Sequence, residues 1–405
     1  MVRRLGVILG VVALLTAGCA QEGPVAGGNE VTVVLDGKTD EFVGAFTAFF
    51  PKELSVHAGS TVDFEMPQVS GEPHTVTLGT LVDAATRKLE QLGPTASLND
   101  QEESAEMLKV VDPFFHEPGP PGPPKLNQSG AQPCFLASGN PPGVVNEGKQ
   151  PWLTGGSAAC EEQEQGEFDG TQSFYNSGML FEEGASFSVD LADDIKPGTY
   201  DFMCLVHRGA MTGRLNVVDA DQDVPSADEV RQQGRAQFDE LVAKLAPALD
   251  VVKKGTAQKV VSGAAVPDVF DGVVAEFGPK EFSIPVGGKV AWEFFFFHTL
   301  AFNTSEEDIG LIQRAADGSI VLNPKAAPTN SPNPPESNSF FPPPRDAKPF
   351  TIDAGEWNGE GFRSSGLLAS VPPMIITYTT TFTKAGTYRF QCQLHPDMKG
   401  QVRVG

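Results

Sequence analysis

The chain has 405 residues and a formal net charge of −23, with 52 acidic side chains against 29 basic ones. This charge excludes a nucleic-acid-binding protein, because affinity for phosphate backbones depends on clustered Lys and Arg. The length suits two domains or one large one. Pro and Gly are abundant and strand-like segments outnumber helical ones, so the sequence predicts an all-β chain with long loops.

Residues 1–19 have the pattern of an export signal. Arg3 and Arg4 give a positive start, and the apolar run after them is too short to span a bilayer. The run ends in Leu-Thr-Ala-Gly-Cys at Cys19, which resembles a bacterial lipobox. The resemblance implies lipid on Cys19, a flexible tether over residues 20–30, and a periplasmic or outer-face location, membrane-anchored without a spanning segment. A plain secretory signal with an incidental cysteine is the alternative.

Two stretches of the chain repeat one another. Residues 50–64 align without a gap on residues 278–292, with Pro, Lys, Glu, Ser, Gly and Val at equivalent places. Later in each copy, residues 176–207 align on residues 364–395 at one constant offset. Chance does not hold one register over so long a stretch, so we interpret the chain as two copies of one domain.

The first copy is predicted to cover residues 31–219 and the second copy residues 258–405. Apolar and polar side chains alternate within both copies, as half-buried strands require. Each copy also contains a long excursion, at about 79–172 in the first and about 303–360 in the second. Loops of this length are either functional covers or poorly ordered.

Residues 226–254, between the copies, are predicted to form a linker helix. Ser226 and Glu229 have the spacing of a capping box, and apolar residues recur after them at helical spacing. Pro247 should end or kink this helix, because proline cannot continue the backbone hydrogen-bond ladder. We expect the helix to pack on one or both domains.

Near its end, each copy has a Cys, a His three residues later and a Met beyond it. These residues are Cys204, His207 and Met211 in the first copy, and Cys392, His395 and Met398 in the second. On a loop between two strands, such side chains can converge on one metal ion. A thiolate and imidazoles with a weak axial thioether suit copper in both oxidation states, whereas structural zinc sites rarely use Met.

These loops resemble those of the cupredoxin (blue-copper) family, to which plastocyanin, amicyanin and azurin belong. The second loop matches the C-x-x-H-x-x-M pattern of amicyanin, and the first is one residue longer. The resemblance implies one more ligand upstream, which His74 and His298 supply at equivalent positions. It also implies two tandem Greek-key β-sandwiches joined by the helical linker, with two copper ions per chain. His57 and His116 have no counterpart in the repeat and are interpreted as incidental.

Two departures from the family pattern bear on the redox potentials. Many small members have Asn after the upstream histidine, where it ties the two ligand loops together, but here Thr75 and Thr299 follow. The aromatic run at 292–297 is also denser than the polar segment at 67–73. We therefore expect a drier second site with a different reduction potential. The alternative is that the aromatic run serves ordinary core packing.

The remaining cysteines are Cys134 and Cys160, both in the first excursion. Cys19 is assigned to lipid and the two cysteines of the metal loops to copper, so this pair is free to form a disulfide. An exported location permits such a bond.

The sequence argues against a copper enzyme. Multicopper oxidases need His-x-His and His-Cys-His motifs, and copper nitrite reductases need a histidine beside the blue-copper cysteine; this chain has neither. The expected function is single-electron transfer to or from a redox partner, a cytochrome or another copper protein. The excess of acidic side chains favours a partner with a basic surface. Copper buffering or delivery is the alternative, although the Met-rich or His-rich segments usual for it are absent from the sequence.

Overall fold

The computed structural model describes residues 30–66, 71–93, 96, 98–111, 128–131, 165–305, 308–314, 320–329, 348–370 and 374–405. The predicted export signal with Cys19, nearly all of the tether, His116 and the predicted disulfide of Cys134 and Cys160 lie outside these residues. Among the described helices, none is long and apolar enough to cross a membrane.

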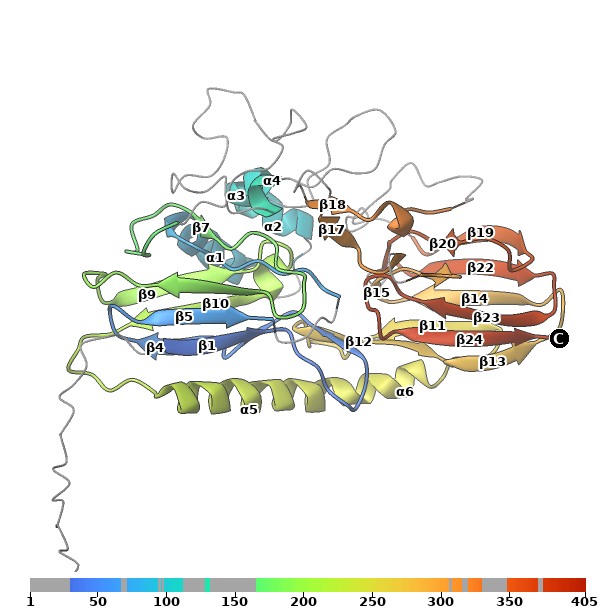
Figure 1. The fold of residues 1–405 in the computed structure, drawn as a ribbon, viewed down its shortest axis with the longest axis horizontal. Helices are drawn as coiled ribbons and strands as arrows, with labels where there is room; N and C mark the ends of the chain where they lie inside the picture. Colours follow the sequence, from blue (N-terminus) through green and yellow to red (C-terminus); the bar gives the residue numbers. More distant parts are fainter. Residues whose placement is uncertain are drawn as a thin grey trace, which may run out of the picture.

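The first copy folds into two sheets that face one another (Figure 1). One sheet has the order β3-β1-β5-β8, formed by Phe49–Phe50, Glu30–Leu35, Thr61–Glu65 and Ser186–Asp190. The other has the order β4-β10-β9-β6-β7, formed by Glu53–Val56, Thr212–Val217, Gly198–Met203, Thr77–Leu78 and Tyr175–Asn176. The alternation predicted for this copy is confirmed, because every second residue of β4 and β5 is buried.

The second copy repeats this arrangement, with one additional strand at each end of its first sheet. Its first sheet has the order β19-β22-β14-β11-β12-β2, formed by Phe350–Trp357, Ile376–Phe382, Lys289–Phe294, Lys259–Ala264, Gly272–Gly278 and Gly44–Phe46. Its second sheet has the order β13-β24-β23-β16-β20, formed by Glu281–Ile284, Lys399–Val404, Gly386–Gln391, Ala301–Phe302 and Arg363–Ser364. The predicted fold class, an all-β chain of two tandem sandwiches with a helical linker, is confirmed.

The strand β2 links the two copies. It precedes β3 in the sequence of the first copy, yet it pairs antiparallel with β12 of the second copy, Phe46 opposite Gly272. Close by, the backbone N–H of Val43 donates to the carboxylate of Glu276 at 3.0 Å. The sheet of the second copy therefore ends on a strand supplied by the first.

The linker forms the helix α5 (Ala227–Leu245), followed by a 3-10 turn and the short helix α6 (Leu249–Val252). The capping box is present, because the Ser226 side chain accepts from the backbone of Glu229 and the Glu229 carboxylate accepts from that of Ser226. The helix ends before Pro247, as predicted. Figure 1 shows both helices running along one side of the two sandwiches.

A cluster of buried apolar side chains joins this helix to both copies. The ring of Phe238 on α5 lies 4.9 Å from that of Phe46 and 5.4 Å from that of Phe50, both with edge-to-face geometry. Val274 of β12 and Leu245 belong to the same cluster. The helix thus shares its apolar face with both sandwiches, which fixes their relative placement.

The two excursions contain more regular structure than the sequence analysis expected. The first includes the helices α1 (Thr80–Leu92), α2 (Leu98–Ser104), α3 (Glu106–Val111) and α4 (Gln128–Ala131). The second includes the ladder of β17 (Ile312–Arg314) and β18 (Ile320–Leu322), and also β19 of the main sheet. The apolar face of α1, which includes Val82, Ala85 and Leu89, was a helical signal in the sequence that our interpretation overlooked.

Phe238→Ala should lower the free energy of unfolding by about 3–5 kcal/mol, because it removes a buried aromatic ring from the cluster that joins the helix to both copies. Denaturant unfolding of the variant and the parent measures the difference. Gln232→Ala, at an exposed position of the same helix, should change stability by no more than about 0.5 kcal/mol. Equal effects of the two substitutions would contradict the role given to this cluster.

Candidate metal centres

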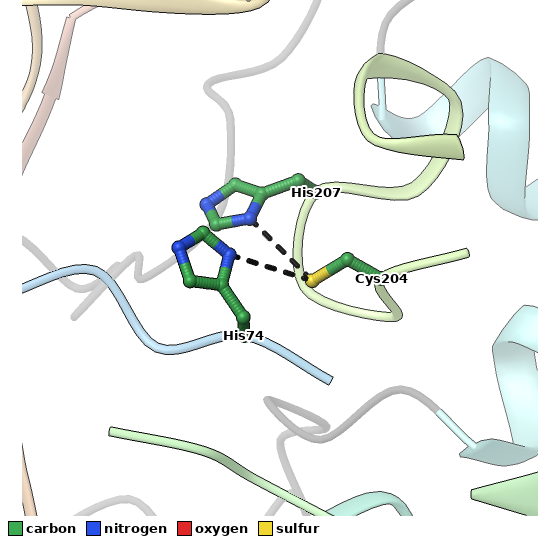
Figure 2. Close-up of side chains that lie close together, drawn as sticks. All are labelled: His74, Cys204 and His207. Carbon is green, nitrogen blue, oxygen red and sulfur yellow. Dashed lines mark hydrogen bonds between the residues drawn. The ribbon is translucent and has the colours of Figure 1, made fainter. Parts of the chain in front are cut away.

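The first centre is formed by His74, Cys204 and His207, whose side chains lie close together (Figure 2). His74 is held by two backbone hydrogen bonds to Leu180, of 2.9 and 2.7 Å. Cys204 directly follows β9, and His207 lies in the loop between β9 and β10. That loop is closed by the backbone N–H of Cys204, which donates to the carbonyl of Met211 at 2.9 Å.

The three side chains of the first centre point toward one another. The sulfur of Cys204 lies 3.5 Å from Nδ1 of His207 and 4.0 Å from Nδ1 of His74. Figure 2 shows both imidazole rings turned toward this sulfur. Cys204 and His74 are fully buried, and the side chain of His207 is 14% exposed. The three donor atoms form a compact, nearly dry cluster.

The second centre has the same construction. His298 ends β15 (Phe296–His298), which pairs with β21 (Leu368–Ser370). The sulfur of Cys392 lies 3.9 Å from Nδ1 of His298 and 3.6 Å from Nδ1 of His395, and the two Nδ1 atoms are 3.0 Å apart. The backbone N–H of Cys392 donates to the carbonyl of Met398 at 2.8 Å, which closes the loop as in the first centre.

The spacing of the donor atoms fits a single bound metal ion. For zinc, metal–sulfur and metal–nitrogen bonds of about 2.3 and 2.0 Å that meet at about 110–120° place sulfur and nitrogen about 3.5–3.7 Å apart. The separations to His207 and His395 are 3.5 and 3.6 Å, within this range, and those to His74 and His298 are 4.0 and 3.9 Å, slightly longer. In each centre all the donor atoms lie within 4.8 Å of one another. One thiolate with two imidazoles is a donor set that suits copper.

The two methionines predicted as axial ligands end the two loops. Met211 has an exposed fraction of 0% and Met398 of 1%. The carbonyl of each accepts from the backbone of the cysteine in its own loop. Both residues therefore lie at the ends of the loops that carry the cysteine and histidine, and both are buried. Their role as axial ligands stays a prediction.

Thr75 and Thr299 join the two segments that form each centre. The backbone N–H of each threonine donates to the cysteine sulfur at 3.3 Å. The Thr75 hydroxyl accepts from the backbone of Leu205 at 2.8 Å, and the Thr299 hydroxyl accepts from that of Gln393 at 2.7 Å. Threonine thus makes the tie between ligand segments that the family pattern assigns to Asn.

The charged groups near the first centre lower the pKa of its thiol. Burial alone raises the pKa of Cys204, but the neighbouring His207 and His74 outweigh it and hold the pKa well below its usual range. Burial alone lowers the pKa of His207, but the charge of Cys204 and the hydrogen bond to Glu72 raise it to about 10. The cluster therefore favours a thiolate, the form that binds metal.

The pKa values of the cysteine and the loop histidine shift in the same directions in the second centre, but the upstream histidines of the two centres differ. Burial opposes charge on Cys392 and His395, but their mutual attraction lowers the pKa of the thiol and, with Glu72, raises that of the imidazole to about 10. The pKa of His298 is lowered by burial. The pKa of His74 is raised despite burial, because its Nε2 lies 3.5 Å from the carboxylate of Asp36.

Sequence analysis missed the two carboxylates beside the histidines, the buried Asp36 and the largely buried Glu72. Asp36 has an exposed fraction of 0%, and its Oδ1 also accepts from the backbone of Phe46 at 3.1 Å. Glu72 lies between the two centres, 2.8 Å from Nε2 of His395 and 3.4 Å from Nε2 of His207. His57 joins neither cluster, and its Nε2 lies 2.9 Å from the carbonyl of Gln222.

No protein-family model matches the chain, and no curated protein matches it. Solved structures similar to parts of the chain are cupredoxins. An amicyanin variant in its Cu(I) form is 17% identical, covering 37% of this chain and 82% of that one with a TM-score of 0.18. Reduced auracyanin from Roseiflexus castenholzii is 17% identical, with coverages of 48% and 99% and a TM-score of 0.21. A purple cupredoxin from Nitrosopumilus maritimus is 14% identical, with coverages of 36% and 98% and a TM-score of 0.16.

Proposed function

We propose that the chain is an electron-transfer protein with two copper sites. The supporting observation is that one cysteine sulfur and two Nδ1 atoms converge in each copy, within 4.8 Å of one another. The eight proposed ligands are His74, Cys204, His207 and Met211 in the first site, and His298, Cys392, His395 and Met398 in the second. Copper held by such donors is oxidised and reduced by one electron.

The protein's own residues would keep the ligand geometry unchanged between the two oxidation states. Both cysteine sulfurs accept backbone N–H bonds from a threonine, which also ties the two ligand segments together. All three donor residues of the second site have exposed fractions of 1% or less. Rigid packing and the exclusion of water lower the reorganisation that accompanies a change of charge.

Burial of the ligands supports a carrier rather than an enzyme. The most exposed donor residue, His207, has a side chain that is only 14% exposed. A substrate that had to reach the metal would meet buried side chains at both sites, whereas an electron needs no such access. Copper buffering or delivery remains the alternative, and copper release rates measured beside reduction rates distinguish the two functions.

Cys204→Ser and Cys392→Ser should each remove about one of the two bound copper equivalents and the blue absorption of that site, because the thiolate is the strongest donor of the set. Metal analysis and the visible spectrum measure both changes. The matched control is His57→Gln, which alters a histidine outside both clusters and should keep two coppers. Retention of both blue centres in either cysteine variant would contradict the assignment of these cysteines as copper ligands.

Thr299→Val should lower the free energy of unfolding of the metal-free protein by about 1–3 kcal/mol, because the buried N–H of Gln393 loses its acceptor. Thr299→Ser keeps the hydroxyl and should be the less damaging change. Denaturant unfolding of the three proteins measures the order. If the valine variant were as stable as the parent, the threonine bond would not be what holds the ligand segments together.

We further propose that lipid on Cys19 anchors the protein at the outer face of the cytoplasmic membrane or in the periplasm. The lipobox-like sequence supports this location. Cys19→Ser should therefore move the protein from the membrane fraction to the soluble fraction, as measured by fractionation of the host cells. An unchanged distribution would favour an ordinary secretory signal.

The excess of acidic side chains supports a basic redox partner, a cytochrome or another copper protein. A formal charge of −23 attracts a positively charged protein over a distance set by salt screening. The salt dependence of the electron-transfer rate measures this attraction.

A further inference from the structure

Glu72 lies between ligand histidines of the two centres. Its carboxylate accepts a hydrogen bond from Nε2 of His395 at 2.8 Å and lies 3.4 Å from Nε2 of His207. The Nδ1 atoms of the same rings face the sulfurs of Cys392 and Cys204, at 3.6 and 3.5 Å. Each imidazole therefore spans the distance from its own cysteine to the one shared carboxylate.

The backbone beside Glu72 is held against the loop of the second centre. A Cβ at Gly71 would lie 1.5 Å from the carbonyl oxygen of Leu394, so no larger residue fits without a shift. Val206, from the loop of the first centre, packs against the apolar cores of both copies. The Glu72 side chain is only 12% exposed. The carboxylate is thus fixed in a largely dry interface rather than placed on a mobile surface loop.

The repeat does not explain Glu72. It stands two residues before His74, and the residue two before His298 is Phe296. A residue needed to build each centre would have an acidic counterpart in the second copy. Glu72 occurs once, where the two copies meet. We therefore interpret its contacts as joining the two centres and not as building either centre alone.

We propose that Glu72 is a positioning residue that couples the two centres, with Cys204, His207, Glu72, His395 and Cys392 forming a continuous path for electron exchange within the chain. This inference rests on the proposed function, since it requires a redox metal in both sites. Exchange along the path oxidises one centre and reduces the other by one electron. No covalent bond breaks, and no atom or proton has to move.

The shared carboxylate has a measurable electrostatic consequence. A negative charge beside a ligand ring stabilises the oxidised, more positive form of a centre more than the reduced form. Since Glu72 contacts a ligand of each centre, removing its charge should raise both reduction potentials. Asp36 supplies a contrast, because its carboxylate lies 3.5 Å from Nε2 of His74, a proposed ligand of the first centre.

The test uses single-site backgrounds of the full-length, copper-loaded protein. Cys204→Ser leaves the second centre, and Cys392→Ser leaves the first. Glu72→Gln should raise the midpoint potential in both backgrounds, as followed by redox titration of the blue absorption. Asp36→Asn should raise it only where the first centre remains, and Glu65→Gln, at an exposed position, should raise neither.

A purely structural role for Glu72 would not give this pattern, because a local change of packing has no reason to raise the potential of both centres. Glutamine keeps the size of the side chain but has one acceptor oxygen in place of two, so it can accept from only one of the two rings. An unchanged potential of the second centre in the Cys204→Ser background would overturn the coupling, while its blue colour would leave the proposed function intact. A wild-type protein without blue copper would overturn both.

A measurement on the wild type does not depend on the folding of any variant. After photoreduction of less than one centre per chain, the electron should redistribute between the centres at a rate independent of protein concentration, followed by paramagnetic resonance of rapidly frozen samples. A rate proportional to concentration would show exchange between molecules and overturn the path. Where Glu72→Gln folds, it should slow the intramolecular phase.

Discussion

The hydrogen bond between a threonine and the cysteine loop is the constraint on which each centre depends. Thr75 and Cys204 are 129 residues apart in the sequence, yet the backbone of one contacts the sulfur of the other. A flexible chain does not hold two distant segments at this separation without a packed core to support them. The sandwich supplies that core, and the threonine fixes the last few ångströms.

Burial makes the charge of each ligand side chain depend on its neighbours. A buried thiol is normally uncharged, and a buried imidazole is normally neutral. In each centre the two groups are placed so close that their attraction outweighs the cost of desolvation, and the thiol pKa falls. The short distance between the two groups therefore offsets the cost of burying them, and this lasts only while both members and their hydrogen-bond partners stay in place.

The sequence predicted what the repeat and local patterns determine. The shared register selected His74 and His298 as upstream ligands, and the structure brings both to their cysteines. Alternating apolar residues predicted β4 and β5, and the Ser-x-x-Glu pattern predicted the start of α5. These features depend on near neighbours or on the duplication, so they are visible without the fold.

The features that were missed depend on how the two copies pack together. The strand β2 has no sequence signal that assigns it to the sheet of the other copy, since edge pairing is decided by which surface comes close. Glu72 and His395 are 323 residues apart, and the repeat, which indicated the proposed ligands, contains no counterpart of Glu72. Comparing the two copies of a duplicated domain can thus reveal the residues that both copies share. The residues that join the two copies are the ones that this comparison leaves unmatched.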